Sequence, residues 1–178
     1  MQFKLKFYKT IKIKYKMPKK ESSLNELKKN YKKVQKKYNL PEFEKLNEDF
    51  QIEKLSELET DYLIREVRRF MGEKFSNYLR FVEAILNPTN VPTFIFSIVK
   101  SIRTEERNKL MEIYKQISKL ELELIELDIS FSEKNEANFI KGSYDIWQKI
   151  KQDTLGIITV IKSNWDNKFE GKSKGYFG

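Results

Sequence analysis

The stretch Thr104–Phe131, TEERNKLMEIYKQISKLELELIELDISF, decides the fold of this chain. Thr104 is predicted as an N-cap, because Glu105 and Glu106 follow it at the positive end of a helix dipole. Apolar residues then recur at alternating spacings of three and four, which is the heptad pattern of a packed helix. The heptad row is Leu110, Ile113, Ile117, Leu120, Leu124, Leu127 and Phe131. A second row, predicted to widen the same apolar face, is Met111, Tyr114, Leu122, Ile125 and Ile129.

Two more long helices are predicted on either side of this one. The first runs from about residue 59 to 86 and ends at Asn87, because a residue before proline is disfavoured in the α conformation. Its apolar stripe is Leu63, Val67, Phe70, Met71, Phe75, Tyr78, Val82 and Ile85. The other runs from about residue 134 to 165, with Ile140, Ser143, Trp147, Ile150, Thr154, Ile157 and Ile161 on one face. The fold class is therefore all-α, an elongated antiparallel bundle of three long helices.

Shorter helices are predicted before the bundle. Ser23 and Glu26 form a capping box that starts an amphipathic helix over residues 23–38. A second short helix is then expected through Phe43 and Leu46, with Phe50 as its furthest residue. We divide the chain into a basic N-terminal arm (1–39), a helical bundle domain (40–166) and a flexible tail (167–178).

The first sixteen residues, MQFKLKFYKTIKIKYK, alternate apolar and basic side chains with the period of a β-strand. A lone strand or hairpin is marginal in water, so this leader is expected to be strand-like with a partner, or disordered. Met17 precedes Pro18 and further lysines and reads as a second start. Whether residues 1–16 belong to the native protein is left open.

Composition restricts the chemistry. The 178 residues are 39% hydrophobic and 34% charged, which is typical of a single globular domain. The chain contains no cysteine and no histidine, which excludes disulfides, thiolate nucleophiles, histidine triads and imidazole metal sites. We therefore expect no enzyme and no cofactor. The absence of cysteine is compatible with the cytoplasm, and the apolar run 91–99 is far shorter than the ~20 residues of a membrane span.

Charge is distributed unevenly. Residues 1–40 hold 14 lysines against Glu21 and Glu26, a net charge of +12, whereas residues 41–178 carry −3. Lysines interleaved with aromatic residues are compatible with nucleic acid as a partner of residues 1–38. A solvated amphipathic helix after a disordered leader is the favoured interpretation, and nucleic acid and an anionic membrane surface are the alternatives. The candidate contacts are Lys4, Lys6, Lys12, Lys14, Lys16, Lys28, Lys29, Lys32, Lys33, Lys36 and Lys37.

Arginine is concentrated in one region. All six arginines lie between residues 65 and 107, although lysine is far more frequent elsewhere. Arg65, Arg68 and Arg69 form a candidate anion or ion-pair cluster, in which a planar guanidinium favours paired contacts. Asp61 with Arg65, and Arg69 with Glu73, have the i,i+4 spacing of helix surface pairs. Structural ion pairing is the favoured interpretation and a phosphate site the alternative.

Two E-x-x-E pairs, Glu123 with Glu126 and Glu133 with Glu136, resemble the Mg²⁺ ligands of helical nucleotide pyrophosphatases. Those enzymes need a second paired-acid motif on a facing helix, and the sequence has none, so a solvated face is favoured. Three glycines, Gly72, Gly142 and Gly156, interrupt the predicted long helices. Each costs ~1 kcal/mol against alanine, which predicts close helix approach at these positions.

The segments LPEFEKLNEDFQIEK, IREVRRFMGEKFSNYLRFVEAILNP and FIKGSYDIWQKIK resemble small all-helical archaeal proteins of unknown function, over residues 40–166. The resemblance implies an archaeal, cytoplasmic setting and no catalytic motif. The leading functional hypothesis is a scaffold or adaptor that binds a protein partner, or a second copy, with the heptad row and the connector 87–103. The alternative is an RNA- or ribosome-associated protein that binds through its lysine-rich arm.

Overall fold

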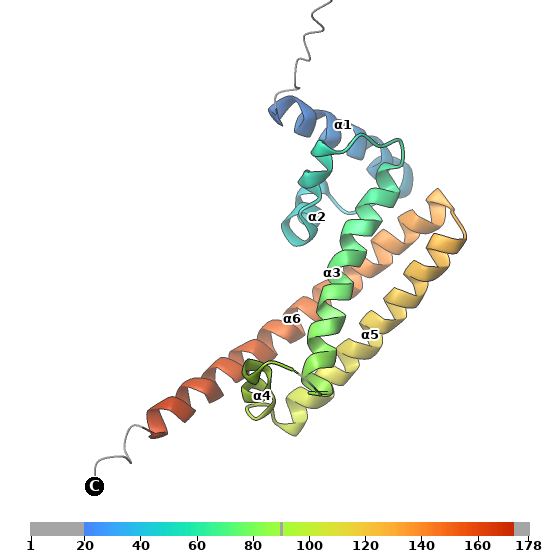
Figure 1. Ribbon diagram of the computed structural model, residues 1–178. Helices are drawn as coiled ribbons and strands as arrows, with labels where there is room; N and C mark the ends of the chain where they lie inside the picture. Colours follow the sequence, from blue (N-terminus) through green and yellow to red (C-terminus); the bar gives the residue numbers. More distant parts are fainter. Residues whose placement is uncertain (1–19, 90, 173–178) are drawn as a thin grey trace, which may run out of the picture.

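The computed structural model describes residues 20–89 and 91–172, and within these ranges all regular structure is helical (Figure 1). The elements are α1 (Lys20–Tyr38), α2 (Phe43–Phe50), the 3-10 helix η1 (Ile52–Glu57), α3 (Leu63–Leu86), α4 (Thr93–Val99), α5 (Thr104–Ile129) and α6 (Glu133–Lys172). The predicted all-α class is confirmed. None of the helices in these ranges combines the length and the apolarity that crossing a membrane requires.

The three long helices α3, α5 and α6 contact one another in pairs. Figure 1 shows the chain reversing direction at α4 and again between α5 and α6, so that neighbouring helices run oppositely. The row predicted for the third long helix is buried throughout, and even Ser143 and Thr154 are only 1% and 5% exposed. In α5 the heptad row is buried from Leu110 to Leu127, but Phe131 lies beyond the helix and is 51% exposed. The prediction that Phe131 belongs to the buried row is wrong.

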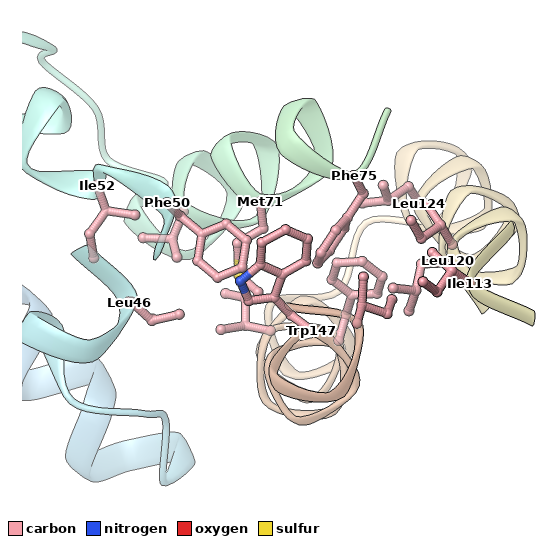
Figure 2. Close-up of a cluster of buried hydrophobic side chains, with 14 of the residues drawn as sticks. Leu46, Phe50, Ile52, Met71, Phe75, Ile113, Leu120, Leu124 and Trp147 are labelled. Carbon is pink, nitrogen blue, oxygen red and sulfur yellow. The ribbon is translucent and has the colours of Figure 1, made fainter. Parts of the chain in front are cut away.

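Aromatic side chains from three elements meet at Trp147 of α6. In Figure 2 the indole lies between Phe50, which ends α2, and Phe75 of α3. Its ring centroid is 5.7 Å from Phe50, 5.9 Å from Phe75 and 4.9 Å from Tyr78. Tilted and edge-on contacts of this kind add to the stabilisation that burial of the rings gives. This cluster joins the short α2–η1 segment to the bundle.

The helix α1 belongs to the same core. Leu27 and Tyr31 are buried, and the Tyr31 hydroxyl donates a hydrogen bond of 2.8 Å to the backbone oxygen of Pro41. Burial raises the pKa of Tyr31 well above its ordinary value. Residues 24–38, assigned from the sequence to a basic arm, therefore contribute to the bundle. The helix begins at Lys20, three residues before Ser23, so the predicted capping box does not start it.

Several predicted boundaries shift. Arg103, and not Thr104, is the N-cap of α5, because the Glu106 carboxylate accepts a 3.0 Å hydrogen bond from the Arg103 backbone N–H. The helix α3 begins at Leu63 and not at about residue 59. Before it, residues 52–57 form η1, which follows a left-handed residue at Gln51 (φ 54°). The helix α6 extends to Lys172, into the predicted tail. The remaining predicted tail, 173–178, and the leader 1–16 lie outside the described residues.

The glycine predictions divide. A Cβ atom at Gly72 would lie 3.1 Å from the Cδ1 atom of Leu124, so α3 and α5 approach closely there, as predicted. At Gly142 and Gly156 a Cβ would meet nothing within 4 Å, so the prediction is wrong for both. Both lie on exposed positions of α6, where no other helix requires the missing side chain.

Candidate functional site

The helix α5 carries apolar residues on two opposite faces. The buried face is the inner row: Leu110, Ile113, Ile117, Leu120, Leu124 and Leu127. The other face is the outer row: Met111, Leu122, Ile125 and Ile129, whose side chains are 40%, 63%, 55% and 82% exposed. With 3.6 residues per turn, the two rows lie roughly 150° apart around the helix.

The outer row corrects two predictions. It was expected to widen the buried face, and the heptad row was expected to supply contact area for a partner. The reverse holds, because α3 and α6 both pack against the inner row. Of the predicted second row, only Tyr114 packs partly against the core. The apolar face of α5 that stays exposed is therefore the outer row.

Charged residues flank the outer row. Glu121 accepts a 2.7 Å hydrogen bond from the Ser76 hydroxyl, and Asp128 accepts one of 2.6 Å from Arg68. Lys119 and Glu126 are exposed and form no ion pair with any residue in the described part of the chain. Among the described residues, the rim of the outer row thus contains one cation, Lys119, and two anions, Glu121 and Glu126, that form no ion pair; Glu121 has only the neutral Ser76 hydroxyl as a partner.

The predicted arginine cluster forms ion pairs, but with other partners than expected. Arg68, 3% exposed, lies 2.6 Å from Asp128 of α5 and 3.7 Å from Glu136 of α6. The Nε atom of Arg65 lies 3.4 Å from the same Glu136 carboxylate. These contacts tie α3 to both other long helices, which the local i,i+4 rule could not reveal.

The third arginine of the cluster lies apart from the other two. Arg69 is exposed and pairs with Glu66 at 3.3 Å, instead of the predicted Glu73. Arg65 likewise pairs with Glu136 and not with Asp61. The structure therefore brings Arg65 and Arg68 together around one buried carboxylate and leaves Arg69 on the surface.

A small cavity adjoins Glu136. It has a volume of ≈ 90 Å³ and is lined by residues that include Tyr62, Arg65, Phe131 and Glu136. The Arg65 guanidinium lies 3.9 Å from the centroid of the Phe131 ring, and the Tyr62 ring meets Phe131 edge-on. Burial raises the pKa of the Glu136 carboxyl, against the opposing effect of Arg68 and Arg65. Arg65 and Arg68 already face this carboxylate, so ion pairing accounts for both cations. The cavity has room for about three water molecules.

The lysines predicted to contact nucleic acid fall into three groups. Lys28 pairs with Glu44 at 3.2 Å, and Lys37 with Glu133 at 3.2 Å, so both hold α1 against the body. Tyr38 and Glu133 raise the pKa of Lys37. Exposed lysines share the remaining face of α1: Lys29, Lys32, Lys33 and Lys36. The others, Lys4, Lys6, Lys12, Lys14 and Lys16, lie outside the described residues.

The acidic pairs do not converge. Glu133 lies at the surface, where Tyr38 and Lys37 lower its pKa, whereas Glu136 is buried beside the arginines. Glu126 is exposed and Glu123 is half-buried. Across residues 20–89 and 91–172, no three acidic side chains come together as metal ligands would.

One polar cluster was missed from the sequence. Asp49 of α2 is 5% exposed and accepts hydrogen bonds from Lys151 (2.6 Å) and Gln148 (2.8 Å) of α6. Lys74 of α3 donates to the Asp49 backbone oxygen, and its ammonium lies 5.1 Å from the Trp147 ring centroid. Burial lowers the pKa of Lys74, against the opposing charge of Asp49. The cluster joins α2 to two long helices, and no local sequence signal marks it.

Comparison with protein-family models, curated proteins and solved structures finds no match to this chain. The sequence resemblance to small archaeal helical proteins therefore stays a prediction. The interpretation of the site rests on the chemistry of the described residues.

Proposed function

We propose that this protein is a non-enzymatic helical scaffold or adaptor that binds a protein partner through the outer row of α5. The observation that supports this is the exposure of Leu122, Ile125 and Ile129 on one face, 63%, 55% and 82%. Aliphatic side chains gathered on one face of a helix mark interaction surfaces more often than scattered ones do. Burying these three against a partner would contribute about 4 kcal/mol before the costs of association.

The chemistry of the remaining candidate sites supports a binding function over catalysis. Two cavities, of ≈ 90 and ≈ 140 Å³, are smaller than the roughly 300–1,000 Å³ of small-molecule sites. The most buried charged groups, Arg68, Glu136 and Asp49, are used in ion pairs between helices. Their arrangement resembles structural cross-links and leaves no group poised for proton transfer to a substrate.

A photo-crosslinking amino acid at Ile125 tests the proposal in cells that express the full chain. We expect crosslinks to a protein, with peptides that map to the outer row, and loss of that complex in the Leu122→Lys variant. Leu155 of α6, 56% exposed, is the matched control position, because it is apolar and on another helix. Equal crosslinking at Ile125 and Leu155, or a complex that survives Leu122→Lys, would refute the proposal.

A second function, RNA or ribosome binding, is favoured by one observation. Four lysines, Lys29, Lys32, Lys33 and Lys36, share an exposed face of α1, next in sequence to the lysine-rich residues 1–19. Phosphate contacts of this kind make affinity fall steeply with salt.

Deleting residues 1–38 would not test RNA binding, because Leu27 and Tyr31 are part of the core. We instead compare the full chain with a variant carrying glutamine at the four exposed α1 lysines. If RNA is bound, this variant reduces both the affinity and the slope of its salt dependence in gel-shift titrations. Unchanged affinity and slope would rule out a contribution from this face of α1.

A further inference from the structure

We propose that the partner of the outer row is a second copy of this chain, packed antiparallel through α5. The inference rests on the proposed function and names its partner. The outer row belongs to a complete second seam of alternating three- and four-residue spacings, the pattern of coiled-coil contacts. The seam positions are Thr104, Asn108, Met111, Lys115, Ser118, Leu122, Ile125 and Ile129.

The seam is apolar only at its C-terminal end, which sets the register. In an antiparallel pair centred between Leu122 and Ile125, Leu122 of each copy lies opposite Ile125 of the other copy. Ile129 then lies opposite Ser118, and Lys115 lies at the edge of the contact, next to the end of α5 in the second copy. This is the register that buries all three exposed aliphatic residues and no lysine.

Charge complementarity supports the same register. Antiparallel helices bring together flanking positions of the same kind, which places Lys119 opposite Glu126 of the second copy. The two-fold symmetry of such a pair repeats the contact, giving two ion pairs across one interface. Both side chains are exposed and have no ion-pair partner among the described residues of their own copy.

One rim contact opposes this register, but weakly. It brings Glu121 near Asp128 of the second copy, and the repulsion is reduced because Arg68 already neutralises Asp128. Glu121 accepts a hydrogen bond from Ser76, and the charge of Asp128 is paired with Arg68, 2.6 Å away.

A parallel pair meets like charges instead. When two parallel copies of α5 are aligned residue for residue, Lys115 of one copy meets Lys115 of the other at a seam position. Beside the seam, Glu126 of one copy meets Glu121 of the other. Both contacts are repulsive, and the first lies inside the interface. The sequence of α5 therefore favours the antiparallel pair.

The contact is short, which sets the expected affinity. The apolar part of the seam spans Ser118 to Ile129, or about 16 Å of helix. Burying the three exposed aliphatic residues of both copies gives only a modest gain before the costs of association, and so short a contact falls in the small, transient class of interfaces. We therefore expect a weak dimer that dissociates in the high micromolar range.

Sedimentation equilibrium of the purified full chain in low salt tests the inference. Lys119→Glu or Glu126→Lys alone turns both ion pairs into like-charge contacts, so each should weaken dimerisation about tenfold. The double variant Lys119→Glu/Glu126→Lys restores opposite charges in the antiparallel pair, so its Kd should return to within about threefold of the wild type. Lys109→Glu is the matched control, an exposed α5 position off the seam, and should leave the Kd unchanged. Circular dichroism melts of every variant verify folding.

The inference is overturned if the wild type is monomeric throughout the micromolar range, or if the double variant is no better than the single ones. A monomeric wild type whose Ile125 crosslinks to a different protein, or to residues 1–16 of its own chain, also overturns it. Crosslinking to a different protein would leave the proposed function standing, so the two failures are distinguishable.

Discussion

Replacing Gly72 by alanine should fail to stabilise the protein, although the same replacement at Gly142 or Gly156 should stabilise it. All three glycines lie inside long helices, where alanine is favoured over glycine by about 1 kcal/mol of helix propensity. At Gly142 and Gly156 the new methyl group meets nothing within 4 Å, so that gain is realised in full. For a chain of this size it corresponds to a rise in Tm of roughly 2–4 °C.

At Gly72 the methyl group would lie 3.1 Å from the Cδ1 and 3.5 Å from the Cδ2 of Leu124. Leu124 is 8% exposed and packed in the core, so it must move against its neighbours to relieve the contact. Overpacking of a well-filled core costs about 1–3 kcal/mol, which cancels or exceeds the gain in propensity. We therefore expect Gly72→Ala to be neutral or destabilising by up to about 2 kcal/mol.

Urea unfolding of the three variants, followed by circular dichroism, measures these differences. The quantity compared is the change in free energy of unfolding at Gly72 against that at Gly142 and Gly156, because the gain in helix propensity is the same at all three sites. A Gly72→Ala variant as stable as Gly142→Ala would refute the close approach of α3 and α5. That result would also weaken the assignment of Leu124 to the tightly packed part of the inner row.

Three further predictions concern the same framework. Asp49→Asn should remove a pH-dependent contribution to the free energy of unfolding. Burial raises the pKa of Asp49, but hydrogen bonds and charge from its α6 partners outweigh burial and hold this pKa below its ordinary 3.8. The stability that Asp49 contributes is therefore present above that value and is lost as pH falls through the lowered pKa, so urea unfolding at several pH values should show the wild type losing its excess stability over Asp49→Asn in acid. Arg68→Ala should cost about 3–5 kcal/mol, because it removes one of the two cations that face the buried Glu136 carboxylate and leaves Arg65 alone beside it; a loss below 1 kcal/mol would contradict the buried pair. Leu120→Ala should cost about 2–5 kcal/mol and Leu122→Ala at most about 0.5, since the first is 2% and the second 63% exposed; equal losses in thermal melts would reverse the assignment of the two rows.

The helical rows were predictable because burial imposes a period on sequence. Ser143 and Thr154 show how far that period reaches, since both are buried although their side chains are polar. Their position on the row of Trp147 was a better guide than their hydrophobicity. Periodicity specifies which residues share a face of a helix, and the three long helices have one clear buried face each.

The choice between the two faces of α5 was not predictable from that pattern. Both rows are apolar and both have helical spacing, so the local sequence supports either one as the core. One signal was available: the seam of the outer row is interrupted by Lys115 and Ser118, whereas the inner row is apolar from Leu110 to Leu127. An uninterrupted row is the one that a core requires, because a lysine at its centre would be buried without a partner.

The ion pairs were missed for a different reason. The i,i+4 rule finds partners within one helix, and Arg65 had Asp61 at that spacing. Its observed partner, Glu136, is 71 residues away and on α6. Contacts of this kind depend on how the helices are placed, which the local sequence does not specify.

The outer row contributes little to the stability of a single chain, because its side chains are largely exposed. The exposed positions of α5 from Lys119 onward are three charged residues, Lys119, Glu126 and Asp128, and three aliphatic residues, Leu122, Ile125 and Ile129. The charged residues already suffice to keep this face in water, and 34% of the chain is charged, so aliphatic residues there need a further reason. Because they contribute little to the monomer, the proposed binding would be separable from folding on α5, where the inner row holds the bundle together. The interruption at Lys115 would then limit the proposed contact to the C-terminal three turns, which favours a weak, reversible contact over a permanent one.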